Sequence, residues 1–143
     1  MRTITTLLVT LAICVPAVAA SKKVVQPKDF PTGRPYSAGI LVDDTLYIAG
    51  QIGADFKTGD TPADFEAEAK QCFDNIGAIL KEAGMTFDNA VAVQVYLTDM
   101  SLFQRMNAVY TSYFTDPRPA RTTVGVAKLV GTARMEVTVT AHR

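Results

Sequence analysis

Alternating apolar and polar side chains mark several short segments of the chain as β-strands with one buried face. The clearest is residues 90–97, where valine recurs at every second position. Two β-rich runs flank the pair Asp43-Asp44, and this arrangement predicts a hairpin. The expected strands are residues 24–25, 37–42, 45–50, 90–97, 121–126 and 135–141.

Two other segments place apolar residues three or four positions apart, as one buried face of an α-helix requires. We expect the first helix to be capped by Thr61, with Pro62 at its first position and Gly84 at its end. The second helix is expected over residues 102–114. Cys72 falls on the apolar stripe of the first helix, which favours a buried structural thiol over a reactive one.

The predicted elements follow the order β-β-β-α-β-α-β-β, which is typical of an α+β domain. We expect a two-layer sandwich in which a mixed six-stranded sheet carries both helices on one face. Residues 90–126 should form two parallel strands joined by a right-handed helical crossover. The second face of the sheet would then either contact solvent or pack against further copies of the chain.

The last two predicted strands each carry one charged residue within their alternation. Arg121 is in phase with Thr123, whereas Val124 lies on the opposite face of the same strand. Glu136 is in phase with Thr138, and the apolar residues of that strand face the other way. We therefore expect Arg121 and Glu136 to point away from the aliphatic face of the sheet. From this pattern alone, a surface charge is as reasonable an interpretation as a functional one.

The composition describes one globular domain and narrows the classes of function. The chain has 143 residues, of which 48% are hydrophobic and 20% are charged, and its formal net charge is zero. Nothing in this charge balance favours nucleic acid or an anionic membrane as a partner. The single histidine, His142, and the lack of a Cys-x-x-Cys motif argue against a zinc or iron site.

Residues 1–20 have the composition of a signal peptide rather than of a folded element. Arg2 supplies a positive charge, residues 7–15 form a short apolar run, and small residues precede a cleavage point after Ala19 or Ala20. A buried N-terminal element and an uncleaved anchor are the alternatives, although the apolar run is short for a membrane span. We therefore expect an exported protein, periplasmic or secreted, without stable membrane association after cleavage.

Cleavage would leave residues 21–143 as a single domain in which Cys72 is the only cysteine. One cysteine forms no internal disulfide. The exported domain would then depend for its stability on its core or on association with copies of itself.

Short motifs within this domain add a more specific signal than the hydrophobic pattern. They are the segments 35–39, 46–52, 57–59, 75–76, 80–84, 95–100, 106–110, 119–121, 126–129 and 135–137. Each segment is a weak signal alone. In this order and spacing, however, they resemble the Rid (YjgF-like) enamine/imine deaminases over nearly the whole domain.

The resemblance implies a chorismate-mutase-like fold that assembles as a homotrimer, with the sites between subunits. It also implies hydrolysis of 2-imino or 2-enamino acids to 2-oxo acids and ammonia without a cofactor. Arg121 matches the family arginine that binds the substrate carboxylate, and Glu136 matches the glutamate beside the attacking water. Tyr36 and Asn107 match residues that line the cleft. The backbone of Gly50 matches a position that contacts the substrate or the water.

Some positions depart from the pattern of the family. Relatives often carry Gly where this chain has Arg34, and a hydroxyl residue where it has Ala49. An additional cation at Arg34, if it borders the cleft, would alter which acid binds. Relatives also commonly have Pro at the position of Val130, and Cys or Ser near Thr123. These departures make the substrate less predictable than the fold.

Hydrolysis of an imine is a reaction that this set of residues could perform. A protonated imine is already electrophilic, so an arginine that orients the substrate and a carboxylate that activates water suffice. The alternative is a trimeric protein that binds carboxylate ligands, or a holdase-type stress-protective protein, without turnover. A ribonuclease activity, as described for some relatives, is not expected, because the sequence shows neither a basic patch nor a histidine pair.

Overall fold

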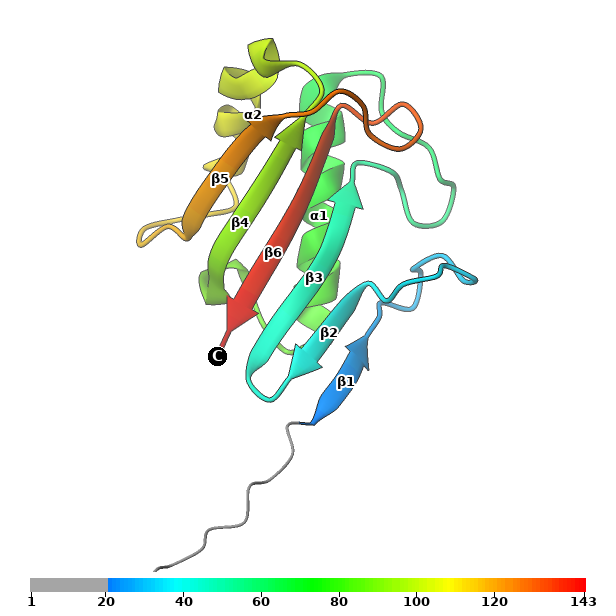
Figure 1. Ribbon diagram of the computed structural model, residues 1–143, viewed down its shortest axis with the longest axis vertical. Coiled ribbons are helices and arrows are strands. Elements are labelled where there is room, and N and C mark those ends of the chain that lie inside the picture. The colour runs from blue at the N-terminus through cyan, green and yellow to red at the C-terminus, as the bar shows by residue number, and fades with distance from the viewer. Residues whose placement is uncertain (1–20) are drawn as a thin grey trace, which may run out of the picture.

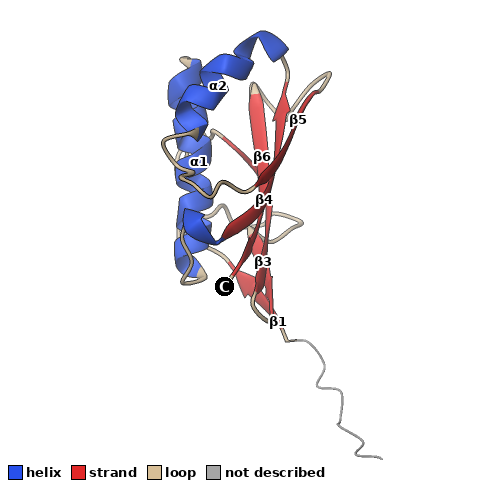
Figure 2. Cartoon of the chain, turned by 90° about the vertical axis from the view of Figure 1, so that its left-hand side faces the viewer, coloured by secondary structure: helices blue, strands red, loops and turns tan. Residues whose placement is uncertain are grey.

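A six-stranded sheet with two α-helices on one of its faces forms the domain (Figures 1 and 2). The computed structural model describes residues 21–143, so the predicted signal peptide lies outside the described residues. The elements are β1 (Lys22–Val25), β2 (Gly39–Val42), β3 (Thr45–Ile52), α1 (Phe65–Glu82), β4 (Ala90–Leu97), α2 (Phe103–Tyr110), β5 (Ala120–Gly125) and β6 (Met135–His142). The predicted element order and the chorismate-mutase-like α+β sandwich are confirmed.

The strands lie in the order β1-β2-β3-β6-β4-β5, and only the pair β4–β5 is parallel. The last strand, β6, therefore enters the middle of the sheet between β3 and β4, as the red arrow of Figure 1 shows. The predicted hairpin of β2 and β3 is confirmed. Although β5 and β6 are consecutive in the sequence, β4 separates them, so their charged residues are not neighbours.

Helix α1 begins three residues later than the pattern of Thr61 and Pro62 suggests. Asp64 is its N-cap, and the side chain of Asp64 accepts a hydrogen bond from the backbone N–H of Ala67 at 2.9 Å. The predicted cap at Thr61 is wrong. The carbonyls of Pro62 and Ala63 accept hydrogen bonds from a side chain outside the helix and do not take part in its first turn. The predicted end at Gly84 is confirmed, since Gly84 has a φ of 71°.

Helix α2 is shorter than the apolar spacing suggests and ends at Tyr110. The hydroxyl of Thr111 donates to the carbonyl of Ala108, and that of Ser112 donates to the carbonyl of Val109. Such local side-chain bonds compete with continuation of a helix. Phe114, beyond the helix, is nevertheless buried in an aromatic cluster with Phe73, Phe87, Tyr110 and Tyr113.

The core lies between the helices and the sheet, and the second face of the sheet carries no helix (Figure 2). On this uncovered face, Val24, Tyr47 and Val124 are 55%, 53% and 41% exposed. Val24 is level with Ile40 of β2, which is level with Tyr47 of β3, so apolar side chains cross three neighbouring strands. Exposed apolar positions of this kind favour contact with another chain.

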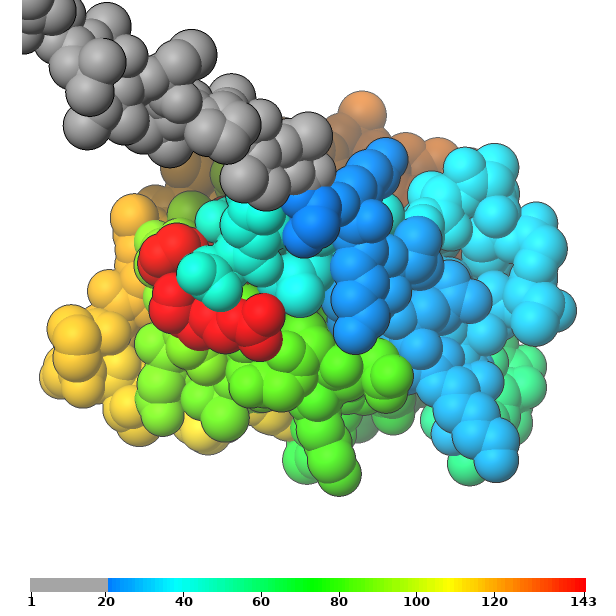
Figure 3. Space-filling view, turned by 90° about the horizontal axis from the view of Figure 1, so that it is seen from below, coloured from blue at the N-terminus to red at the C-terminus, as the bar shows by residue number. Residues whose placement is uncertain are grey.

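The two ends of the strand β6 lie in different surroundings. At its C-terminal end, the backbone N–H of Arg143 donates to the carbonyl of Asp44 at 3.2 Å, which joins the last residue to the β2–β3 turn. Figure 3 shows the red C-terminal residues against this cyan turn. The N-terminal end of β6, which contains Glu136, is at the opposite end of the sheet, where β2 no longer pairs with β3.

Candidate functional site

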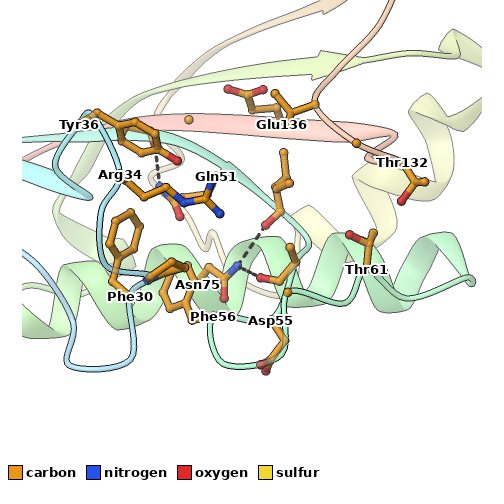
Figure 4. Close-up of a pocket in the computed structure, with 18 residues that line it drawn as sticks. Phe30, Arg34, Tyr36, Gln51, Asp55, Phe56, Thr61, Asn75, Thr132 and Glu136 are labelled. Carbon is orange, nitrogen blue, oxygen red and sulfur yellow. Dashed lines mark hydrogen bonds between the residues drawn. The ribbon is translucent and has the colours of Figure 1, made fainter.

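A cavity of about 630 Å³ opens where β2 stops pairing with β3. Strand β2 is level only with residues 45–48 of β3, and the backbone N–H of Ala49 still donates to the carbonyl of Ala38, so residues 50–52 keep a free edge. These residues and Ala49 line the cavity. Tyr36, Gly50 and Glu136, three of the five site residues predicted from the sequence, line it as well. The other labelled walls in Figure 4 are Phe30, Arg34, Gln51, Asp55, Phe56, Thr61, Asn75 and Thr132.

Glu136 and Gly50 lie in direct contact across the β6–β3 pair. The register of this pair shifts between Ile48 and Gln51, which places Gly50 in an irregular part of β3. A Cβ atom built on Gly50 would collide with the Oε1 atom of Glu136. Only glycine therefore allows the Glu136 carboxylate to rest on the strand backbone at the rim of the cavity.

Two buried amide side chains fix the wall of the cavity. The side-chain amide of Asn75, on α1, donates to the carbonyls of Ile52 at 3.0 Å and Ala54 at 2.8 Å (Figure 4). Gln71, one turn earlier, donates to the Asn75 side chain at 2.9 Å. The amide of Gln51 donates to the carbonyl of Ala49 at 2.9 Å. The bonds from Asn75 and Gln51 satisfy backbone carbonyls of β3 and of the loop that follows it.

An ion pair between the buried Glu68 and Arg134 anchors the segment between Thr132 and Glu136, and both of these residues line the cavity. The carboxylate of Glu68 is fully buried and accepts from the backbone N–H and from Nε of Arg134, both at 2.6 Å. The Arg134 guanidinium also donates to the carbonyls of Pro62 at 3.1 Å and Ala63 at 2.9 Å. A Cβ at Gly53 would collide with the Glu68 backbone, so the loop after β3 packs closely against this pair.

The loop that closes the lower side of the cavity contains a second carboxylate, but this group is occupied. Asp55 accepts hydrogen bonds from the backbone N–H groups of Lys57 at 2.8 Å and Thr58 at 2.9 Å. The bond from Thr58, followed by that from Lys57, holds the pKa of Asp55 below its usual value. Asp55 therefore stabilises its own turn, and Glu136 is the carboxylate better placed to act on a ligand.

Arg121 and Asn107, the remaining predicted site residues, lie outside this cavity. Arg121 is on β5, and its guanidinium lies 4.4 Å from the ring centroid of Tyr110 and 5.8 Å from that of Phe103. Asn107 lies on α2 between these two aromatic residues, at the spacing of one helix face. Arg121 and Asn107 thus belong to one region and Glu136 to another.

The expectation that Arg121 and Glu136 share the face away from the helices is wrong. Arg121 is level with Val93 of β4, which is buried beneath the helices. Glu136 is level with Tyr96 of β4, which is in turn level with the exposed Val124. Neighbouring residues in register point to the same face. The Arg121 side chain therefore points to the helix layer, where the aromatic rings of α2 provide a favourable contact for its guanidinium.

Two hydroxyls near Arg121 have no hydrogen-bond partner within residues 21–143. They are the buried side-chain oxygens of Tyr110 and Thr123. Burial raises the pKa of the Tyr110 hydroxyl, although the positive charges of Arg121 and then Arg118 oppose this shift. A buried hydroxyl without a hydrogen-bond partner costs free energy of folding. The hydroxyls of Tyr110 and Thr123 are therefore available to hydrogen-bond a ligand or another chain at the β5 edge of the sheet.

The cavity wall also contains residues that the sequence patterns do not assign to a site, chiefly Gln51 and Asn75. A weak signal exists for Asn75, because it lies beside the apolar stripe of α1 and a buried amide requires partners. Within residues 21–143, no group of three or more His, Cys, Asp or Glu side chains could hold a metal ion. In the same part of the chain, no helix combines the length and apolar character that crossing a bilayer requires.

The fold is a two-layer α+β sandwich with a cavity at the free edge of β3. Comparison with known proteins shows its family. Residues 27–143 match the family model described as Endoribonuclease L-PSP. The chain belongs to this family, which is the Rid/YjgF family that its motifs resemble.

The relatives include proteins named for a family alone and proteins named for an activity. A RutC family protein of Aquifex aeolicus (strain VF5) is 42% identical over 113 residues, which cover 78% of this chain and 90% of the relative. A 2-iminobutanoate/2-iminopropanoate deaminase of Mus musculus is 41% identical over 118 residues, covering 81% and 87%. The structure of E. coli TdcF with bound serine is similar with a TM-score of 0.78 and 29% identity, covering 85% and 98%.

Proposed function

We propose that the protein hydrolyses reactive 2-imino or 2-enamino acids to 2-oxo acids and ammonia. The observation that carries this proposal is the Glu136 carboxylate resting on Gly50 at the rim of a cavity large enough for a small acid. The name of the mouse relative is consistent with this activity, and the serine-bound relative is consistent with a site for an amino-acid-like ligand.

We further propose that the site is completed between subunits of a homotrimer. One chain contributes a cavity with Tyr36, Gly50 and Glu136, whereas Arg121 and Asn107 lie elsewhere on the same chain. The uncovered sheet face, with its exposed Tyr47 and other apolar residues, is the surface we assign to the contact. Cyclic assembly would place the Arg121 of one subunit beside the cavity of the next.

In the proposed reaction, Arg121 binds the carboxylate of the substrate through two parallel hydrogen bonds and orients the imine carbon. Water adds to this carbon, one proton passes from the water to Glu136, and the electron pair of the C=N bond moves to nitrogen. In the carbinolamine, Glu136 returns its proton to the amino nitrogen, the C–N bond breaks as a lone pair of the hydroxyl oxygen forms the C=O bond, and the departing ammonia takes up the hydroxyl proton to become ammonium. The protonated imine and one water thus yield the 2-oxo acid and one ammonium ion.

The decisive experiment compares Arg121→Ala and Arg121→Lys with the unchanged protein. The substrate is 2-iminopropanoate, generated in situ by an amino-acid oxidase, and its loss is followed together with the oligomeric state. We expect kcat/KM to fall at least about 100-fold for Arg121→Ala, and Arg121→Lys to restore little, because lysine cannot make the bidentate contact. Arg118→Ala, which removes an exposed arginine of the preceding loop, is the matched control and should retain activity.

Equal rates for the Arg121→Ala protein and the unchanged protein would refute the enzyme proposal. Binding of carboxylate ligands without turnover, seen as a rise in Tm, would favour the alternative of a ligand-binding or stress-protective trimer. Export is a separate proposal that rests on residues 1–20. N-terminal sequencing of the protein from its own cells should find a start after Ala19 or Ala20, and a start at Met1 would refute it.

A further inference from the structure

The cavity that contains Glu136 also receives an arginine from the loop before β2. Figure 4 shows Arg34 extending from this loop below Tyr36 into the space in front of Gln51. Phe30, Phe56 and Tyr36 form the apolar side of the same space, with ring centroids of Phe30 and Phe56 5.3 Å apart. The exposed Arg34 side chain thus lines the same cavity as the Glu136 carboxylate.

No ion pair neutralises Arg34 within residues 21–143. Of the carboxylates in the surrounding loops, Asp29 pairs with Lys57 at 3.4 Å, and Asp55 accepts two backbone N–H groups of its own turn. Glu136 lies on Gly50. The guanidinium of Arg34 thus has its hydrogen-bond donors free for an anion that enters the cavity.

The cavity is open to solvent and has a volume of about 630 Å³, which lies within the range of small-molecule sites. An imine with a short alkyl side chain would fill only part of this space. A substrate with a longer, charged side chain would displace more water and would reach the free cation.

We propose that Arg34 binds a second carboxylate, so that the substrates of the site are imines of acidic amino acids. This inference rests on the proposed function, in which the carboxylate next to the imine carbon is bound by Arg121 of the neighbouring subunit. The carboxylate of the substrate side chain then pairs with Arg34, and the imine carbon lies between the two arginines, beside Glu136. Two cations at opposite ends of the substrate would select both its charge and its length.

The test measures a ratio of specificity constants. The unchanged protein and Arg34→Gln are compared on 2-iminosuccinate and on 2-iminopropanoate, each generated in situ by an amino-acid oxidase. We expect the ratio of kcat/KM for the dicarboxylic over the monocarboxylic imine to fall at least about 10-fold in Arg34→Gln, mainly through KM. Lys28→Gln removes a cation of the same loop that does not line the cavity, and the ratio should stay unchanged.

A ratio that is the same in the unchanged protein and in Arg34→Gln would overturn the inference, because Arg34 would then be a solvated charge. An equal fall for both imines would overturn it too, since Arg34 would not distinguish the second carboxylate. Should the unchanged protein hydrolyse neither imine, the proposed function fails, and binding still decides the role of Arg34. Calorimetry with succinate and propanoate then supports Arg34 only if succinate binds at least about 10-fold more tightly and Arg34→Gln removes this difference.

Discussion

The region around Glu136 and the region around Arg121 are held together by different forces. Glu136 lies on the backbone of Gly50, in a cavity whose walls are fixed by buried amides and by the Glu68–Arg134 pair. Arg121 lies on the edge strand β5 over the ring of Tyr110, without a carboxylate partner among residues 21–143. One region has a shaped cavity, and the other has a free cation at the edge of the sheet.

This difference indicates which parts of a site one chain can build alone. Hydrogen bonds and burial fix the cavity within the subunit, because loops 53–61 and 126–134 pack against α1. The cation packs on the aromatic rings of the helix layer at an edge strand, and among residues 21–143 it has no carboxylate partner, which a ligand or another chain would supply. Division of a site in this way would couple activity to assembly.

The largest expected effect is restoration of activity by mixing two inactive proteins. Arg121→Ala and Glu136→Ala should each lose nearly all deaminase activity, because each lacks one half of every site. When the two chains are co-expressed in equal amounts, about half of the sites receive an intact arginine, and about half of those also receive an intact glutamate from the neighbour. The mixture should therefore show about a quarter of the unchanged activity.

This experiment separates a divided site from one contained in a single chain. Mass spectrometry of the intact complexes confirms that both chains are present in one assembly. If Arg121 and Glu136 acted within the same chain, every site would lack one of them, and the mixture would stay inactive.

The next largest effect is expected on stability, for a substitution of Glu68 in the Glu68–Arg134 pair beside the cavity. Glu68→Ala leaves the backbone N–H groups of Arg134 and Met135 and the Nε of Arg134 without the acceptor that Glu68 provides. Each buried donor left without an acceptor costs about 1–3 kcal/mol, so chemical denaturation should show a much lower free energy of unfolding, although the Arg134 side chain is 34% exposed and remains partly solvated.

The matched control for this prediction is a carboxylate on the exposed side of the same helix. Glu66 accepts hydrogen bonds from Arg105, which lower the pKa of Glu66 to about 2. Because this pKa is depressed, its contribution to stability is present above the ordinary value of 4.5 and is lost as the pH falls towards 2. Glu66→Gln at neutral pH should change the free energy of unfolding far less than Glu68→Ala. Equal losses in the two variants would contradict the assignment of Glu68–Arg134 as the fixed wall.

Sequence reasoning predicts the fold more completely than the arrangement of the site. The order of the elements follows from alternation and helical spacing, which depend on burial within one chain. Gly50 lies beside Glu136, and its contact with the substrate or the water stays a prediction. Glu68 has a recognisable signal, since it is a charged residue in phase with Phe65 and Cys72 on the buried side of α1.

The side of the sheet that Arg121 occupies could not be predicted, and the reason is physical. Alternation assigns faces only where one face is apolar and buried. On the edge strand β5, Val124 is exposed in the single chain, whereas Arg121 packs on aromatic rings. Valine on an uncovered face and arginine on a helix layer invert the usual rule, and an interface with another chain would explain both.

The smallest effect is expected for substitutions of Tyr110, which test whether this residue positions Arg121 through its ring or through its hydroxyl. The guanidinium of Arg121 lies 4.4 Å from the ring centroid, and the hydroxyl of Tyr110 has no partner within residues 21–143. Tyr110→Phe keeps the ring and should leave KM within about 2-fold, whereas Tyr110→Leu should raise KM about 2- to 5-fold, which corresponds to a cation–π contribution of about 0.5–1 kcal/mol.

Tyr110 is buried, so Tyr110→Leu also lowers stability, and activity must be compared at a temperature where both variants remain folded. A positioning role predicts that KM rises while kcat changes little, because the substrate carboxylate is bound in the ground state as well as in the transition state. If Tyr110→Phe and Tyr110→Leu raise KM equally, the hydroxyl rather than the ring is responsible. In that case the unpartnered oxygen of Tyr110 would itself be the group that contacts the ligand, and the region around Arg121 would contribute a hydrogen-bond donor as well as a charge.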